Sequence, residues 1–258
     1  MNRWIGRVAL VTGASAGIGA AITKDLARQG MQVVASARSL DKLVTLRKEV
    51  ESESWKGSVA PKQCDLSNSA EVEGMFSWIK EKFGGVDVCV NNAGYISPDC
   101  TLLDGQPSEW RKMLEVNILA LTACSNLSIK HMMSRSVDDG HIINIGSLLC
   151  HRVVGGRYAK MRFQAAIKHM TAALTEGLRQ ELRERNSNIR VSLVSPSGVD
   201  TSIRSLLCED LTNEGQNNSE RTQLINVQEV ADVVVSVLRQ KPHLEVHEVF
   251  FRPTSQKD

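Results

Sequence analysis

The chain has 258 residues, of which 42% are hydrophobic, and its formal net charge is +2. Acidic and basic residues are spread along the sequence, which argues against a nucleic-acid partner, and no apolar run is long enough to span a membrane. The six cysteines include no C-x-x-C pair, so we expect free thiols in a cytoplasmic protein and no disulfide framework.

Strand-like apolar runs alternate with amphipathic segments of helical length. We expect strands at residues 7–13, 32–37, 60–66, 86–94, 141–147, 189–196 and 245–251. We expect helices at residues 17–29, 40–53, 69–83, 107–135, 160–185 and 227–240. Apolar strands separated by helices indicate an α/β fold, in which right-handed crossovers build a doubly wound parallel sheet with helices on both faces.

No repeat and no linker-like composition divides the chain, so we expect a single domain over residues 1–258. The polar stretch at residues 202–223 does not fit the strand–helix alternation. It has two interpretations, either a surface excursion or a lid over a substrate pocket.

A glycine-rich loop, "VTGASAGIG", joins the first strand to the first helix. Gly13, Gly17 and Gly19 permit a tight turn and a close approach of backbone N–H groups to a pyrophosphate, with Ser15 and Ile18 in the same loop. Such spacing also occurs in purely structural turns. The order of strand, loop and helix favours a dinucleotide-binding site.

Arg38 stands at the end of the second strand, where enzymes that prefer NAD usually carry an acidic residue. No acid follows until Asp41. A guanidinium pairs well with the 2′-phosphate of NADP, so we expect NADP(H) as the cofactor and not NAD. The alternative is a solvent-exposed loop arginine.

Further motifs resemble those of the short-chain dehydrogenase/reductase family along essentially the whole chain. These are "TGASAGIG", "CDLSN" with Asp65 and Leu66, "NNAG" with Asn92, Ala93 and Gly94, "VNILA" with Asn117, and "IINIGS" with Ser147. The resemblance implies that the first three motifs bind the cofactor. It also implies that Asn117 organises a catalytic water and that Ser147 binds the substrate carbonyl.

Finer features, such as "HRV" and "ALTEGLRQELRE", resemble a branch of animal enzymes that includes insect farnesol dehydrogenases. The resemblance implies a Rossmann-type sheet with strand order 3-2-1-4-5-6-7. It also implies a small apolar ketone, aldehyde or alcohol as the substrate, such as a ketosteroid or an isoprenoid, and a homodimer or homotetramer as the assembly.

In this family a tyrosine gives the proton, and a lysine four residues later binds the cofactor and lowers the tyrosine pKa. The segment "IKHMTAALTEGLRQEL" resembles the family helix and places Lys168 at the lysine position. Gln164 then occupies the tyrosine position, and an amide has no usable acidic proton. Loss of a general acid costs roughly 10²–10⁴ in rate.

Tyr158 is a candidate substitute for that tyrosine. On a continuous helix it would lie about 240° around the axis from Gln164, which is the wrong phase for facing Lys168. It could approach from the side only if residues 155–163 form a loop. The alternative is a loop tyrosine that partly covers the pocket.

The segment "SPSGVDT" carries Pro196 and Thr201, which the resemblance places beside the nicotinamide, but Ser197 replaces the usual glycine. No His, Cys or Asp cluster has metal-ligand spacing, so no metal is expected. Two functions stay open. The first is an NADP-dependent oxidoreductase, a carbonyl reductase type, and the second is a catalytically degenerate relative that binds NADP(H) as a scaffold subunit.

Overall fold

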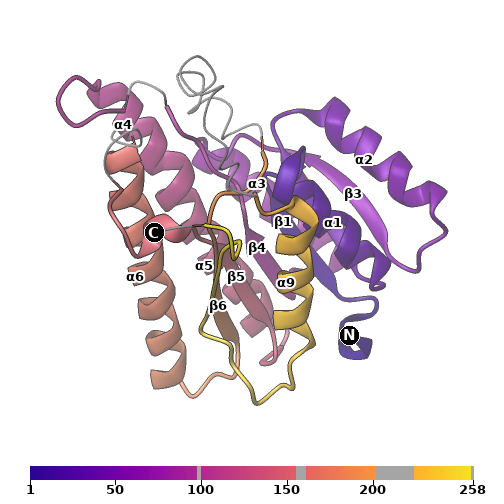
Figure 1. Ribbon diagram of the computed structural model, residues 1–258. Helices are drawn as coiled ribbons and strands as arrows, with labels where there is room; N and C mark the ends of the chain where they lie inside the picture. Colours follow the sequence, from indigo (N-terminus) through magenta and orange to yellow (C-terminus); the bar gives the residue numbers. More distant parts are fainter. Residues whose placement is uncertain (98–99, 155–160, 202–223, 257–258) are drawn as a thin grey trace.

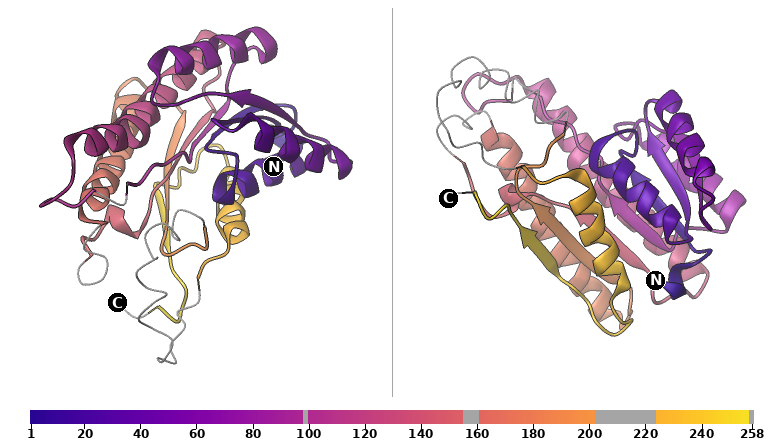
Figure 2. Two further views of the ribbon diagram at one scale, coloured as in Figure 1. Left: turned by 90° about the horizontal axis from the view of Figure 1, so that it is seen from above. Right: turned by 45° about the vertical axis from the view of Figure 1, so that its right-hand side comes forward.

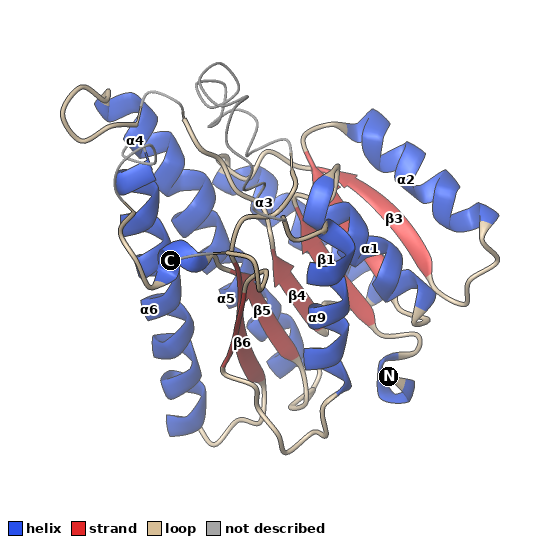
Figure 3. Cartoon of the chain, in the orientation of Figure 1, coloured by secondary structure: helices blue, strands red, loops and turns tan. Residues whose placement is uncertain are grey.

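The computed structural model describes residues 1–97, 100–154, 161–201 and 224–256. Seven parallel strands form one sheet in the order β3-β2-β1-β4-β5-β6-β7, as the predicted fold requires (Figures 1 and 3). They are β1 (Val8–Thr12), β2 (Gln32–Ala37), β3 (Ser58–Gln63), β4 (Val88–Asn91), β5 (His141–Ile145), β6 (Arg190–Pro196) and β7 (Glu248–Phe251).

Helices connect these strands in the described chain. They are η1 (Asn2–Trp4), α1 (Gly17–Arg28), α2 (Leu40–Ser52), α3 (Ser69–Phe83), α4 (Pro107–Leu114), the π-helical turn η2 (Glu115–Leu119), α5 (Ala120–Ser134), η3 (Leu148–Cys150), α6 (Arg162–Glu184) and α9 (Val227–Arg239). None of them is long and apolar enough to cross a membrane.

Several predicted boundaries were wrong. The strand expected at residues 86–94 covers only Val88–Asn91, because the following residues leave the sheet to pack on the glycine-rich loop. The strand expected at 60–66 begins earlier, at Ser58, and ends at Gln63, before the turn at Asp65. The helix expected at 107–135 is interrupted by η2.

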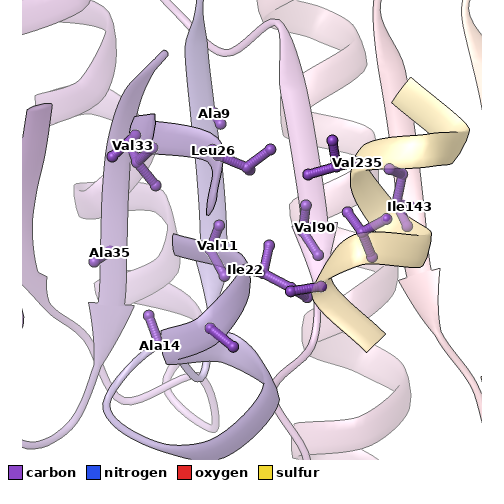
Figure 4. Close-up of a cluster of buried hydrophobic side chains, with 14 of the residues drawn as sticks. Ala9, Val11, Ala14, Ile22, Leu26, Val33, Ala35, Val90, Ile143 and Val235 are labelled. Atoms are coloured by element: carbon purple, nitrogen blue, oxygen red, sulfur yellow. The ribbon is translucent and has the colours of Figure 1, made fainter. Parts of the chain in front are cut away.

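Helices lie on both faces of the sheet (Figure 2), and the core lies in two layers, one on each face. Alternate residues of β1 point to opposite faces, so Ala9 and Val11 join the layer under α1, α2 and α9, whereas Val8 and Leu10 join the layer under α3, α5 and α6. Figure 4 shows Ile22 of α1 among the first layer. Burying each such side chain stabilises the fold by about 1.5–3 kcal/mol.

The amino end of β5 carries a fully buried histidine. His141 Nε2 lies 2.8 Å from Ser192 Oγ, and that hydroxyl donates its own proton to Val246 O. The histidine therefore donates through Nε2. Burial lowers the pKa of His141 well below its usual value, and the nearby guanidinium of Arg190 lowers it further.

One edge of the sheet is the strand β3, which pairs only with β2. The backbone N–H groups of Ser58 and Cys64 donate toward the β2 side, to Met31 O and Ala37 O. Because successive residues of a strand alternate, positions 59, 61 and 63 present their nitrogens outward. Position 61 is a proline and has no N–H to offer.

Candidate active site

The glycine-rich loop after β1 is held against the end of β4 by side chains of both strands. Thr12 Oγ1 accepts hydrogen bonds from the backbone N–H groups of Asn92 and Ala93, each at 3.1 Å. Asn92 Nδ2 donates to the carbonyl oxygens of Thr12 at 2.9 Å and Gly13 at 3.2 Å. Gly13 has a φ of +66°, and a Cβ there would lie 2.8 Å from Ala93 Cα, so the close approach requires glycine.

Helix α1 begins at Gly17, and its N-cap residue, Ala16, supplies no side-chain cap. Among the described residues, the first-turn N–H groups therefore have no capping side chain. Gly17 has a φ of +56°, and a Cβ there would extend to 3.5 Å from Thr201 Cγ2. Ser15 and Ile18 are half-buried in the same loop. A helix N-terminus with open backbone donors suits a pyrophosphate.

Arg38 directly follows β2 and its side chain is exposed at the carboxyl edge of the sheet. Gln63 donates a hydrogen bond to its carbonyl oxygen at 2.9 Å, which ties the end of β2 to β3. Asp65, in the turn after β3, accepts from the N–H and hydroxyl of Ser67. These bonds lower the pKa of Asp65, and the charge of Arg38 contributes to the same shift. Leu66 is half-buried beside it.

Asn117 sits in the π-helical turn η2, which separates α4 from α5. Its side chain is 4% exposed and donates to Met113 O at 2.7 Å and Tyr95 O at 2.8 Å, while its Oδ1 accepts from Tyr95 N at 3.2 Å. A Cβ at Gly94 would lie 3.2 Å from Asn117 Oδ1. The π turn thus directs Asn117 onto the segment after β4, next to the predicted cofactor loop.

Ser147 and Lys168 meet at the carboxyl end of β5. Ser147 is the N-cap of η3, and its Oγ accepts a hydrogen bond from Leu149 N at 3.2 Å. Lys168 projects from α6 and donates from Nζ to Ile145 O at 2.9 Å. Burial lowers the pKa of Lys168, and the nearby Cys150 thiol opposes this shift. The structure therefore brings these two predicted residues to the same strand end.

Gln164 lies one helical turn before Lys168, on the same face of α6. It is 3% exposed, and its Oε1 has no hydrogen-bond partner among the described residues. Further along this face Thr171 and Thr175 are also buried. The inward face of α6 therefore carries a row of polar side chains that includes Gln164, beside buried apolar residues such as Ile167.

The segment after β6 closes the site from the other side. Pro196 ends β6, and Ser197 follows it without a positive φ, so serine replaces glycine there without backbone strain. Ser197 is 7% exposed, and its Oγ has no hydrogen-bond partner in the described chain. Thr201 lies beside Gly17 across the cofactor loop.

Two predictions lie outside the described residues. These are the substitute role of Tyr158 and the lid at residues 202–223. The described residues contain no cluster of His, Cys, Asp or Glu that could hold a metal ion.

Sequence reasoning missed a polar network directly beneath the site. Asn91 Nδ2 donates to Asn144 Oδ1 at 2.8 Å and to Ser125 Oγ at 2.9 Å, and Asn144 Nδ2 donates to Thr175 Oγ1 at 2.9 Å. These bonds link β4, β5, α5 and α6. The signal was an asparagine near the end of each of two otherwise apolar strands.

Tyr95 was also missed, although it directly follows the "NNAG" motif. Its hydroxyl donates to Glu109 Oε2 at 2.8 Å, and the Lys112 ammonium lies 4.7 Å from its ring centroid. Burial and the Glu109 carboxylate raise the pKa of Tyr95, so its phenol stays protonated.

The residues present fit a dinucleotide. The uncapped start of α1, the space that a side chain at position 17 would fill, and the partnerless hydroxyl of Ser197 lie around one edge of the sheet. Arg38 adds an exposed cation at the same edge. These groups are donors and cations, as an anionic cofactor needs.

Comparison with known proteins agrees with this architecture. Residues 7–212 match the family model described as short chain dehydrogenase. The chain is 43% identical over 256 residues to dehydrogenase/reductase SDR family member 11 of Gallus gallus, covering 99% of each chain. It is 38% identical to farnesol dehydrogenase of Aedes aegypti, covering all of both chains.

Solved structures resemble it as well. A metagenomic short-chain oxidoreductase in complex with NADP superimposes with a TM-score of 0.79 at 31% identity, over 97% of this chain and 98% of the other. An archaeal alcohol dehydrogenase from Thermococcus sibiricus, complexed with 5-hydroxy-NADP, gives 0.80 at 26% identity, over 98% of both. By sequence and by fold, the chain belongs to the short-chain dehydrogenase family.

Proposed function

We propose that the protein is an NADP(H)-dependent oxidoreductase that interconverts an apolar ketone or aldehyde and the corresponding alcohol. The observation that carries this proposal is the meeting of Ser147 and Lys168 at the end of β5, beside a loop suited to a dinucleotide. The comparisons support this proposal, since one relative is named a farnesol dehydrogenase and a solved neighbour is in complex with NADP.

The cofactor would lie along the carboxyl edge of the sheet. The glycine-rich loop and the start of α1 would hold its pyrophosphate, and Arg38 its 2′-phosphate. Asp65 and the segment at Asn92–Gly94 would border the adenosine. When bound, NADPH supplies the hydride for carbonyl reduction.

The chain's own residues would orient the carbonyl and exclude water. Ser147 Oγ already accepts from Leu149 N, so its single proton is free to be donated to a carbonyl oxygen. Lys168 is fixed by Ile145 O, which leaves two further N–H groups for a ribose hydroxyl or a water. Asn117, held by Met113 O and Tyr95, would keep the segment after β4 in place.

Gln164 favours a second candidate, a relative that binds NADP(H) but has lost catalysis. Its side chain is buried at the position where the family carries its proton-donating tyrosine, and a neutral amide does not give up a proton. Such a protein would act as a binding or scaffold subunit. We place the oxidoreductase first because Ser147 and Lys168 lie at the same strand end and Asn117 is held against the segment after β4, which supports the proposed roles.

We also propose a homodimer or homotetramer in the cytoplasm. Leu119, at the end of η2, and Met133 on α5 are 62% and 43% exposed, and Met170 on α6 is 42% exposed. Apolar side chains on neighbouring long helices are suited to association. Cys64, Cys89, Cys124 and Cys150 are buried free thiols, which agrees with a reducing compartment.

Purified protein would be tested for NADPH consumption with ketosteroids, diketones and isoprenoid aldehydes. NADPH binding would be measured separately by fluorescence. Turnover that Ser147→Ala abolishes supports the oxidoreductase. Tight NADPH binding without turnover on any substrate, together with turnover in Gln164→Tyr, would establish the binding subunit instead.

A further inference from the structure

The buried amide of Gln164 raises the question of what donates a proton in this site. Its Oε1 is buried from solvent and accepts no hydrogen bond from the described chain. An acceptor buried without a donor is costly, by about 1–3 kcal/mol. Buried polar atoms of this kind are commonly satisfied by an ordered water.

The nearest acidic group along α6 is the ammonium of Lys168. Residues four apart on a helix are neighbours on its surface, and both side chains face the strand end that carries Ser147. One of the three N–H groups of Lys168 Nζ donates a hydrogen bond to Ile145 O at 2.9 Å, so two N–H groups remain. The Gln164 Oε1, which has no donor among the described residues, could accept a hydrogen bond from a water that in turn accepts one from the ammonium.

We propose that Gln164 holds a water which carries a proton from Lys168 to the substrate oxygen, so that Lys168 is the general acid of this enzyme. In this respect the chain would differ from relatives that use a tyrosine. The proposal rests on the oxidoreductase function proposed above.

Bound NADPH would supply the hydride that reduces the carbonyl carbon and would be left as NADP⁺. The carbonyl oxygen forms its O–H bond with a proton of the water, and the water takes a proton from the Lys168 ammonium. Lys168 is left as a neutral amine and recovers its proton from solvent.

The surroundings of Lys168 suit this role. Burial lowers its pKa, which makes the ammonium a better acid near neutral pH. The group that acts on it electrostatically is the Cys150 thiol of η3, whose own pKa is raised by burial. Among the described residues no carboxylate shifts the pKa of Lys168, so no anion holds its proton in place.

The kinetic test compares Lys168→Arg with Lys130→Arg, an exposed lysine on α5. Arginine keeps the charge but does not release a proton. We expect Lys168→Arg to lower kcat by roughly 10²–10⁴ and Lys130→Arg to leave it unchanged. Gln164→Leu, which cannot hold the water, should lower kcat as well. In the unmodified enzyme, reduction should slow as pH rises through the lowered pKa of Lys168.

A second readout does not depend on turnover. In protein carrying [ε-¹³C]lysine, the Lys168 signal, assigned by its loss in Lys168→Arg, should titrate below the exposed lysines. In Gln164→Leu it should titrate lower still, because a polar neighbour of the ammonium is gone. Turnover that survives both substitutions would overturn the proton route while leaving the oxidoreductase intact. An unchanged Lys168 titration in Gln164→Leu would overturn the shared water even if no substrate is turned over.

Discussion

Replacing Gly19 by alanine should damage both stability and cofactor binding. A Cβ at this position would lie 2.4 Å from Gly13 O and 2.5 Å from Asn92 Nδ2. Both are fixed atoms, since Asn92 Nδ2 donates to the carbonyl oxygens of Thr12 and Gly13. Forcing a methyl group into a packed site costs about 1–3 kcal/mol, and each weakened hydrogen bond adds about 0.5–1.5 kcal/mol. We expect a total loss of roughly 2–6 kcal/mol.

Gly74 provides a matched control, because it also lies inside a helix, α3, but a Cβ there meets nothing within 4 Å. Gly74→Ala should stabilise the protein by about 0.5–1 kcal/mol. Urea unfolding would measure both variants, and fluorescence titration would measure NADPH affinity, which we expect to fall at least tenfold in Gly19→Ala alone. If Gly19→Ala unfolds at the same urea concentration as the unmodified protein, the close approach of these two loops is not what requires glycine.

Three further substitutions or conditions test other parts of the structure. Arg38→Leu should weaken NADPH binding by about 10–100-fold, the worth of a charged hydrogen bond, and leave NADH binding unchanged in parallel titrations. Asn91→Leu should cost about 1–3 kcal/mol in urea unfolding, because Asn144 Oδ1 loses its buried donor. Stability should fall below about pH 6.5, because His141 is neutral when folded but charges when unfolded. At pH 5.5 this amounts to about 1.4 kcal/mol, and a flat urea profile between pH 7.5 and pH 5.5 would contradict it.

The doubly wound parallel sheet with helices on both faces could be predicted because it follows from local patterns, whereas the strand order came from the resemblance to the short-chain dehydrogenase/reductase family. Apolar runs such as that around Leu10 alternate with amphipathic helices, and parallel strands leave little choice of topology. The glycine-rich loop could be recognised for the same reason. A side chain at Gly13 or Gly19 would clash with the loop itself or with the neighbouring segment at Asn92 and Ala93.

The remaining features depend on contacts between distant segments. The bond from Asn91 to Asn144 joins two strands, and no periodicity within either strand reveals it. The π-helical turn at Asn117 was hidden because one extra residue barely disturbs an amphipathic pattern. The position of Tyr95 depends on Glu109 of α4, which accepts a hydrogen bond from the Tyr95 hydroxyl.

Pro61 has a consequence for the molecule at high concentration and during folding. A row of outward N–H groups on an edge strand is a template on which a second chain can add a strand. On β3 that row is interrupted at its centre, because position 61 cannot donate and the positions on either side are 59 and 63. The proline therefore protects this edge against edge-to-edge aggregation, and Pro61→Val should make the protein more prone to it.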